Sequence, residues 1–179
     1  MESTESRHLT AGLNILDEKF KTHKTRYVLQ CTLATGAVFI VLMILDALSD
    51  TVIIAALGAS SFIAFTMPRA QVSRPRFLIG GYLVGTVAGI LCHYLCDWLL
   101  LAQWPVVRAC SNVLFGALSV GLAIFLMVIT DTEHPPAAGL ALGFVLNDWD
   151  YLTVLVVVVG IVSLSLIKVL LRPVLMDLL

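Results

Sequence analysis

Long apolar segments make up most of the chain, and polar residues are concentrated in the short turns between them. Four of the segments are long enough to cross a bilayer as a helix, which takes about 20 mostly apolar residues. They are residues 28–48, 77–101, 109–130 and 151–171. Two shorter apolar pieces cover residues 51–67 and 135–146. The second piece would extend only about 18 Å as a helix, against a hydrocarbon core of about 30 Å.

The composition indicates which solvent surrounds these segments. Of the 179 residues, 59% are hydrophobic and 13% are charged, and the mean hydropathy is +0.98. Charged residues make up about 25% of a typical globular domain, so this chain has too little polar surface to face water on every side. We therefore predict an all-α integral membrane protein with four long transmembrane helices and two short helices.

Charged residues in the turns predict how the chain crosses, because Lys and Arg accumulate in cytoplasmic loops. If both short pieces cross, the acidic turns at Asp46, Asp50 and residues 147–150 lie on one side, and of the basic residues only Arg108 joins them. The basic residues on the other side include Lys19, Lys21, Lys24, Arg26, Arg69, Arg74, Arg76, Lys168 and Arg172. If both short pieces instead re-entered the membrane, the three arginines after Met67 would face outward. We therefore expect six passes through the cell membrane with both termini in the cytoplasm, and re-entrant short pieces are the alternative.

The lengths of the six segments follow the order long, short, long twice over. Three passes per half is an odd number, so the second half enters the membrane upside down relative to the first. We expect two inverted three-helix repeats, residues 27–101 and 109–175, within a transmembrane domain of residues 27–179. Residues 1–26 are predicted to form a cytoplasmic segment with an amphipathic helix on the membrane surface.

The sequence DTEHPPAAGL, residues 131–140, leads into the second short piece. Pro135 suits the first position of a helix, where the missing N–H costs nothing, and Pro136 also lacks a donor. The first free backbone N–H groups then belong to Ala137, Ala138 and Gly139. Because a helix N-terminus carries roughly half a positive charge, free donors at membrane depth favour a small anion.

The first short piece contains a comparable run of small residues, whose hydroxyls add donors. The run is Gly58, Ala59, Ser60 and Ser61. Pairing the two runs would give a compact polar centre between the halves, where transporters built from inverted repeats bind their substrates. The alternative is that a side chain of Asp131, Thr132 or Glu133 caps the short helix and that no ligand binds.

His134 and the charges beside it allow two interpretations as well. With an ordinary pKa of about 6.5, the imidazole could couple proton movement to an anion, or it could stay neutral and lock the turn through a backbone carbonyl. Asp131 and Glu133 have the charge to pair with arginines on the same face and so latch the two repeats together. Those arginines are Arg69, Arg74 and Arg76.

Three motifs together resemble the HPP family of membrane proteins. They are TEHPPAAG at 132–139, LGASSFIAF at 57–65 and RPRFLIGGYLVG at 74–85. The family name refers to the tripeptide seen here as His134, Pro135 and Pro136, and the resemblance covers roughly residues 27–171. It implies four membrane helices, and some relatives in plastids and photosynthetic bacteria are associated with nitrite transport. A small monovalent anion, nitrite first, is therefore the expected substrate.

This sequence departs from the family pattern at two places near the second motif. Relatives tend to show Gln-Pro-Arg-Asn before the helix and a histidine after the paired glycines. Here Arg74, Pro75 and Arg76 are followed by Phe77, and Tyr82 follows Gly81. The lost polar groups bear on which anion is bound.

Two further patterns on the third segment are read first as structure. Gly81, Gly85 and Gly89 lie four apart, the spacing that lets membrane helices approach closely, with pore lining as the alternative; Ala117 and Gly121 offer a similar groove. Such glycine-rich faces would also serve a homo-oligomer. The sequence LCHYLCDW at 91–98 contains Cys92, His93, Cys96 and Asp97 without the spacing of a zinc site, so we expect no metal and no cofactor.

These observations leave one leading function and two alternatives. The leading prediction is a transporter or channel for a small anion, with the lipid bilayer as its only other expected partner and no nucleic acid. A structural or assembly protein that moves nothing is one alternative. An intramembrane enzyme built from Glu133, His134, His93 and Asp97 is the other, but the two pairs are expected at opposite membrane levels, and no catalytic motif occurs. We therefore expect no enzyme activity.

Overall fold

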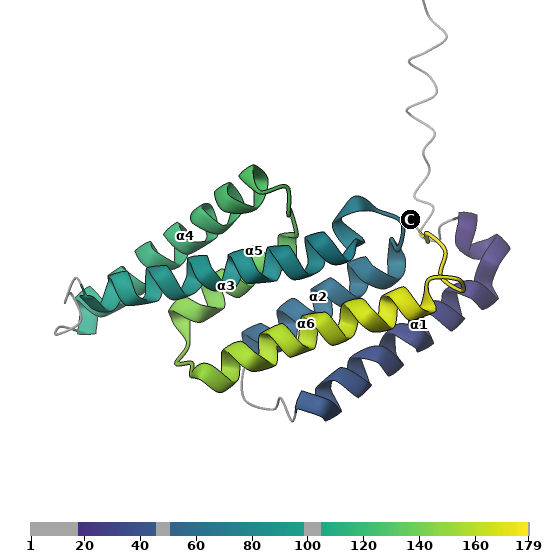
Figure 1. Cartoon of the computed structure of the whole chain (residues 1–179), viewed down its shortest axis with the longest axis horizontal. Coiled ribbons are helices and arrows are strands. Elements are labelled where there is room, and N and C mark those ends of the chain that lie inside the picture. The colour runs from purple at the N-terminus through teal and green to yellow at the C-terminus, as the bar shows by residue number, and fades with distance from the viewer. Residues whose placement is uncertain (1–17, 46–50, 99–104, 179) are drawn as a thin grey trace, which may run out of the picture.

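The computed structural model describes residues 18–45, 51–98 and 105–178, and within these ranges it contains helices and no strand (Figure 1). The elements are α1 (Glu18–Leu45), α2 (Thr51–Thr66), the 3-10 turn η1 (Gln71–Ser73), α3 (Pro75–Trp98), α4 (Pro105–Ile129), α5 (Pro135–Leu146) and α6 (Tyr151–Leu171). The expected surface helix within residues 1–26 falls almost wholly outside the described ranges and stays a prediction.

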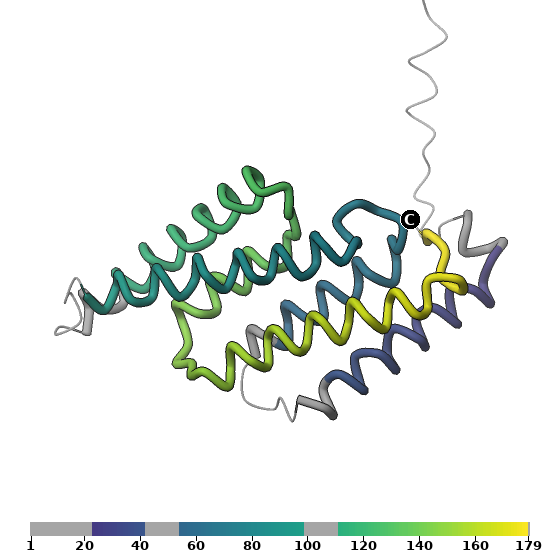
Figure 2. The backbone as a smooth tube through the Cα atoms, in the orientation of Figure 1, coloured from purple at the N-terminus to yellow at the C-terminus, as the bar shows by residue number. Residues whose placement is uncertain are grey.

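Consecutive helices run in opposite directions, so α1, α3 and α5 point one way and α2, α4 and α6 the other (Figure 2). The bundle therefore has two ends. We call the one formed by η1, residues 130–134 and residues 172–178 the His134 end. We call the one formed by the last turns of α3 and residues 147–150 the His93 end.

Three helices are long and apolar enough to cross a membrane: α3, residues Ser111–Ile129 of α4, and α6. They coincide with three of the four long segments expected from the sequence. The fourth, residues 28–48, overlaps α1, which does not reach this threshold among the described residues and is kinked at His23. α2 and α5 are the two short apolar helices, as predicted.

Apolar side chains cover the outside of the bundle as well as its core. Exposed ones include Phe39 on α1, Phe62 on α2, Val87 on α3, Phe125 on α4 and Leu166 on α6. Water solvates such an apolar surface poorly, whereas the hydrocarbon chains of lipids solvate it well. The outer surface thus agrees with the hydropathy of the long helices.

The packing of α5 against α3 depends on the three glycines of α3. The two helices run parallel, with Gly81 beside His134, Gly85 beside the Ala137 carbonyl and Gly89 beside the Ala141 carbonyl. A Cβ at Gly81 would come 2.6 Å from the His134 Cβ, and one at Gly89 would come 2.7 Å from the Ala141 oxygen. The predicted packing role of these glycines is therefore confirmed.

Because α5 fills this glycine face within the chain, the face is not available to a second copy. The groove at Ala117 and Gly121 on α4 differs, since no atom lies within 4 Å of a Cβ built at Gly121. Association of copies through that groove stays a prediction.

Local hydrogen bonds set where the last helix starts. The Asp150 N–H donates to the Thr153 hydroxyl oxygen at 3.4 Å, and the Asp150 carboxylate accepts from the Thr153 backbone N–H at 2.8 Å, which together form a capping box at the start of α6. The carboxylate also accepts from the Thr153 backbone N–H and hydroxyl at once, the hydroxyl at 2.9 Å. The same hydrogen bonds, the backbone one first, hold the pKa of the Asp150 carboxyl below its ordinary value.

Candidate functional site

The turn between α4 and α5 directs His134 into the bundle. Asp131 has a φ of 51°, in the left-handed region that ends many helices. Its N–H donates to the Val128 carbonyl at 3.3 Å, and the Thr132 N–H donates to the Met127 carbonyl at 3.0 Å, the two bonds of a Schellman motif. Asp tolerates this conformation better than most residues. The acidic residue that follows the apolar run is thus the residue that ends its helix.

His134, in the second half of the chain, is completely buried, and its hydrogen-bond partners lie in the first half. Its Nε2 lies 2.8 Å from the Ser60 hydroxyl of α2, and its Nδ1 lies 3.2 Å from the Val72 carbonyl of η1. Tyr82 of α3 places its hydroxyl 2.8 Å from the same Ser60 oxygen. Ser60 and Tyr82 are also fully buried, so the structure contains a closed polar centre, here called the His134 centre and formed by His134, Ser60, Tyr82 and the Val72 carbonyl.

The acceptors in this centre determine where its protons lie. The Val72 carbonyl only accepts, so the His134 Nδ1 carries a proton. In the neutral imidazole, Nε2 then accepts from Ser60, and the Tyr82 hydroxyl donates to Ser60. If His134 gained a proton, Nε2 would donate to Ser60, whose hydroxyl could turn to the Ala56 carbonyl at 2.9 Å. Both protonation states can therefore satisfy every donor by rotating one hydroxyl.

The start of α5 differs in part from the sequence-based expectation. No side chain among the described residues caps it, so the alternative of capping by Asp131, Thr132 or Glu133 is not what the structure shows. The Thr132 hydroxyl instead lies 2.8 Å from that of Thr130.

The expected row of free amides is nevertheless incomplete. The Ala137 N–H donates to the His134 carbonyl at 2.9 Å. Ala137 is buried, Ala138 is half-buried and Gly139 is exposed, while Pro135 is exposed and Pro136 half-buried. These residues therefore do not all face one site, and His134 is the part of this stretch that reaches the centre.

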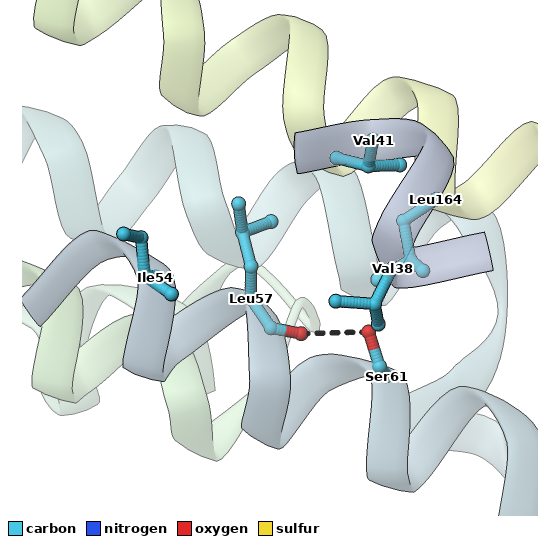
Figure 3. Close-up of a pocket in the computed structure, with 6 residues that line it drawn as sticks. All are labelled: Val38, Val41, Ile54, Leu57, Ser61 and Leu164. Atoms are coloured by element: carbon cyan, nitrogen blue, oxygen red, sulfur yellow. Dashed lines mark hydrogen bonds between the residues drawn. The ribbon is translucent and has the colours of Figure 1, made fainter. Parts of the chain in front are cut away.

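Only one residue of the predicted run in α2 reaches His134. The run from Gly58 to Ser61 begins seven residues inside α2, where the backbone N–H groups are bonded within the helix. The run is therefore not a helix N-terminus that could bind an anion. Gly58 and Ala59 are exposed, and Ser60 joins the His134 centre. Ser61 points elsewhere: its hydroxyl donates to the Leu57 carbonyl at 2.8 Å beside a pocket of about 10 Å³ (Figure 3). That volume is about one water molecule.

The predicted ion-pair latch is present once, on the surface. Arg76 lies 3.2 Å from the Asp131 carboxylate and donates to the Thr130 carbonyl at 3.2 Å, and both charged side chains are more than half exposed. Glu133, Arg69 and Arg74 form no ion pair within the described part of the chain. The Arg69 backbone N–H does donate to the Asp177 carboxylate at 3.0 Å, which ties the first half to the C-terminal segment.

Sequence reasoning missed one residue next to the centre. Lys168 of α6 is buried, and its Nζ donates to the Ser73 carbonyl at 2.8 Å. In the sequence analysis, Lys168 was used only as one of the basic residues that indicate the cytoplasmic side of the membrane. A lysine within an apolar membrane helix is itself a signal of a functional position, and that signal could have singled it out.

His93 lies far from His134, toward the other end of α3. It is twelve residues beyond Gly81, or about 18 Å along the axis. Its Nε2 lies 3.6 Å from the Asp97 carboxylate. A pocket of about 70 Å³ opens beside it, lined by His93, Cys96, Asp97, Asn112, Val145, Leu146, Asn147 and Asp148. The residues suggested for an enzyme are therefore not brought together.

The long apolar helices and the apolar outer surface define a helical membrane protein. A family model for the HPP transmembrane region matches residues 20–176. The chain therefore belongs to the HPP family, which confirms the resemblance carried by the three motifs. No curated protein and no solved structure matches the chain.

Proposed function

We propose that this protein moves a small monovalent anion across a membrane, with nitrite as the first candidate. In this proposal the chain crosses six times as two inverted three-helix repeats, residues 27–101 and 109–175. The alternating helix directions and the matching places of α2 and α5 in the order support that plan (Figure 1). The membrane is the cell membrane.

The sidedness of the proposal rests on charge. Arg69, Arg74, Arg76 and Arg172 gather at the His134 end, where the C-terminal segment also lies. Basic residues favour the cytoplasmic side. We therefore assign the His134 end, with both termini, to the cytoplasm.

The observation that carries the proposal is the His134 centre. His134 is a fully buried titratable side chain that links the second half of the chain to the first. Burying such a group in a membrane protein is costly, and residues of this kind usually mark functional positions. It stands at the start of a short helix whose first two residues are prolines and whose N-terminus has no side-chain cap. A partly positive helix end beside an N–H and two hydroxyls suits an anion.

Polar atoms without partners support a route along α3. Ser73 Oγ, Thr86 Oγ1 and Trp149 Nε1 are buried and have no hydrogen-bond partner among the described residues. Ser73 lies just before α3, Thr86 near its middle, and Trp149 packs against His93 near its far end. Buried polar groups are nearly always bonded, so three orphans at three levels suggest groups that bind a passing solute or water.

The test is uptake of nitrite by liposomes containing the purified protein, compared with protein-free liposomes. We expect uptake that saturates with nitrite concentration. His134→Gln replaces the imidazole with an amide that can still hydrogen-bond but cannot titrate. We expect it to lower the uptake rate at least about tenfold, as for loss of a charge-assisted bond.

His93→Gln makes the same change at the other end of the bundle and serves as the matched control, with a rate within about twofold of wild type. Absence of uptake for nitrite, nitrate and formate in a folded, correctly inserted preparation would leave the assembly protein as the better account.

A further inference from the structure

Lys168 is a buried cation without a carboxylate partner. Its exposed fraction is 4%, and no ion pair within the described ranges includes it. Arg172 and Arg74 act on it with the same sign of charge, and Asp177 acts with the opposite sign. Its ammonium group carries three N–H donors, and the Ser73 carbonyl is the one acceptor it contacts among the described residues. A buried charge so weakly compensated is expensive.

Ser73 presents the complementary anomaly. The residue is fully buried, and its hydroxyl has no partner among the described residues. An unpaired buried hydroxyl destabilises a fold. The unpaired donor and the uncompensated cation lie together, since the carbonyl of Ser73 itself accepts from Lys168.

The same short turn is held at two successive carbonyls by donors from the other half of the chain. His134 donates to the Val72 carbonyl and Lys168 donates to the Ser73 carbonyl. Both donors belong to the second repeat, and both acceptors belong to η1 of the first. The turn therefore closes the His134 end. Its neutral backbone carbonyls accept the hydrogen bonds of the Lys168 ammonium and the His134 imidazole.

We infer that Lys168 and the Ser73 hydroxyl form an anion-binding position next to the His134 centre, and that η1 is the plug that covers it. The inference rests on the proposed anion function and adds the residues that supply its positive charge. The ligand is a small oxyanion, whose oxygen atoms replace the Ser73 carbonyl as acceptors for the Lys168 ammonium and accept from the Ser73 hydroxyl. Because both residues are enclosed, a free ion and not a lipid headgroup is the ligand.

The experiment measures the thermal unfolding midpoint of the purified full-length protein at increasing sodium nitrite, with sodium gluconate at equal ionic strength as the reference. A ligand that binds the folded state raises the midpoint, and the concentration dependence gives an apparent Kd. We expect saturable stabilisation of the wild type by nitrite.

Two substitutions probe the charged member of the position. Lys168→Met removes the charge at similar length and is expected to raise the apparent Kd by at least about tenfold, whereas Lys168→Arg stays within about threefold of wild type. Arg172→Met is the matched control: it removes an exposed neighbouring charge, and we expect a change below about twofold.

Ser73→Ala separates ligand binding from structure. Since the hydroxyl has no partner among the described residues, its removal is expected to raise the unfolding midpoint without nitrite and yet raise the apparent Kd about tenfold. Ser119→Ala is its control, because the buried Ser119 hydroxyl donates to the Gly116 carbonyl at 2.8 Å; we expect a lower midpoint and an unchanged Kd. Ser73→Ala also keeps the inference testable if Lys168→Met does not fold.

The outcomes separate this inference from the proposed function. Nitrite binding that depends on Lys168 and Ser73, with no uptake into liposomes, would support the site and count against transport. Uptake together with wild-type Kd values for both variants would overturn the site and leave transport standing. Absence of nitrite binding to the wild type would overturn the inference as well.

Discussion

The two ends of the bundle each hold a histidine, and their surroundings are opposite. His134 is fully enclosed and bonded to α2 and η1, with the Tyr82 ring 5.7 Å away. His93 is partly exposed beside a polar pocket and an acid that is 58% exposed. It also packs edge-on against Tyr94 and Trp149, with ring centroids 5.7 and 5.5 Å apart.

The difference shows which histidine holds the two halves together. The His93 end has the mixture of aromatic and polar groups typical of a membrane–water interface, where water can replace any lost contact. The side chains of the His134 centre are all buried in this closed arrangement, so water does not simply replace a contact that is lost there. Substitutions at the two ends should therefore have unequal consequences.

The largest difference is expected for alanine at the two histidines. His134→Ala removes the imidazole partner of the Ser60 hydroxyl and of the Val72 carbonyl, removes the ring packed beside Tyr82 and opens a cavity. We therefore expect it to lower the free energy of unfolding by about 3 kcal/mol or more. His93→Ala is expected to cost less than about 1 kcal/mol. Unfolding midpoints in one detergent measure both, and equal losses would remove the contrast between the ends.

A smaller effect is expected when His134 is displaced and not removed. The Cβ of Gly81→Ala would collide with the His134 Cβ, and overpacking of this kind costs about 1–3 kcal/mol. Gly121→Ala adds the same methyl group where no atom lies within 4 Å, so stability is expected to be unchanged or slightly higher. Gly81→Ala should also reduce nitrite uptake, and wild-type uptake and stability in this variant would contradict a close α3–α5 contact at His134.

Substitution of Thr86, on α3 between the two ends, is expected to raise the free energy of unfolding, whereas His134→Ala and Gly81→Ala are expected to lower it. Because its buried hydroxyl has no partner among the described residues, Thr86→Val is expected to raise the free energy of unfolding by about 1 kcal/mol while slowing nitrite uptake. Thr35→Val is the control, since the Thr35 hydroxyl donates to the Cys31 carbonyl at 2.9 Å. A gain in stability with full uptake would exclude Thr86 from the route.

The smallest effect is expected at the surface of the His134 end. Arg76→Gln breaks the exposed pair with Asp131, and such pairs contribute about 0–1 kcal/mol. The loss should shrink further in high salt, because exposed charges are screened. Chemical denaturation at low and high salt measures it, and a loss above about 2 kcal/mol would move Arg76 into the group of residues that hold the halves together.

Segment lengths and hydropathy were enough to predict the helices. The apolar runs around α3, α4 and α6 match the observed helices closely, and the glycine spacing of α3 correctly indicated close packing. His134 was also predicted as a central residue, because it directly precedes a proline-rich helix start next to a long apolar run. The helix positions, the glycine spacing and the proline-rich helix start each depend on residues close together in the sequence, so the sequence pattern is enough to predict them.

Contacts between distant residues could not be predicted in the same way. Ser60 and Ser61 are adjacent in sequence, but successive helix residues point about 100° apart, so one joins His134 and the other faces Leu57. The partners of Lys168 and His134 in η1 lie 95 and 62 positions away. Only the packed bundle decides which side chains meet across such separations.

The most direct test of the central claim is whether an ion in water reaches the His134 centre. In a variant with its four native cysteines replaced by alanine, Ser60→Cys should react with a small anionic methanethiosulfonate reagent in liposomes, and nitrite should slow that reaction. Ala59→Cys, next in sequence but exposed on the lipid-facing outside of α2, should stay unreactive with or without nitrite. If the thiol of the Ser60→Cys variant stays unreactive, or reacts at the same rate with and without nitrite, the His134 centre is a structural contact and not part of an anion route.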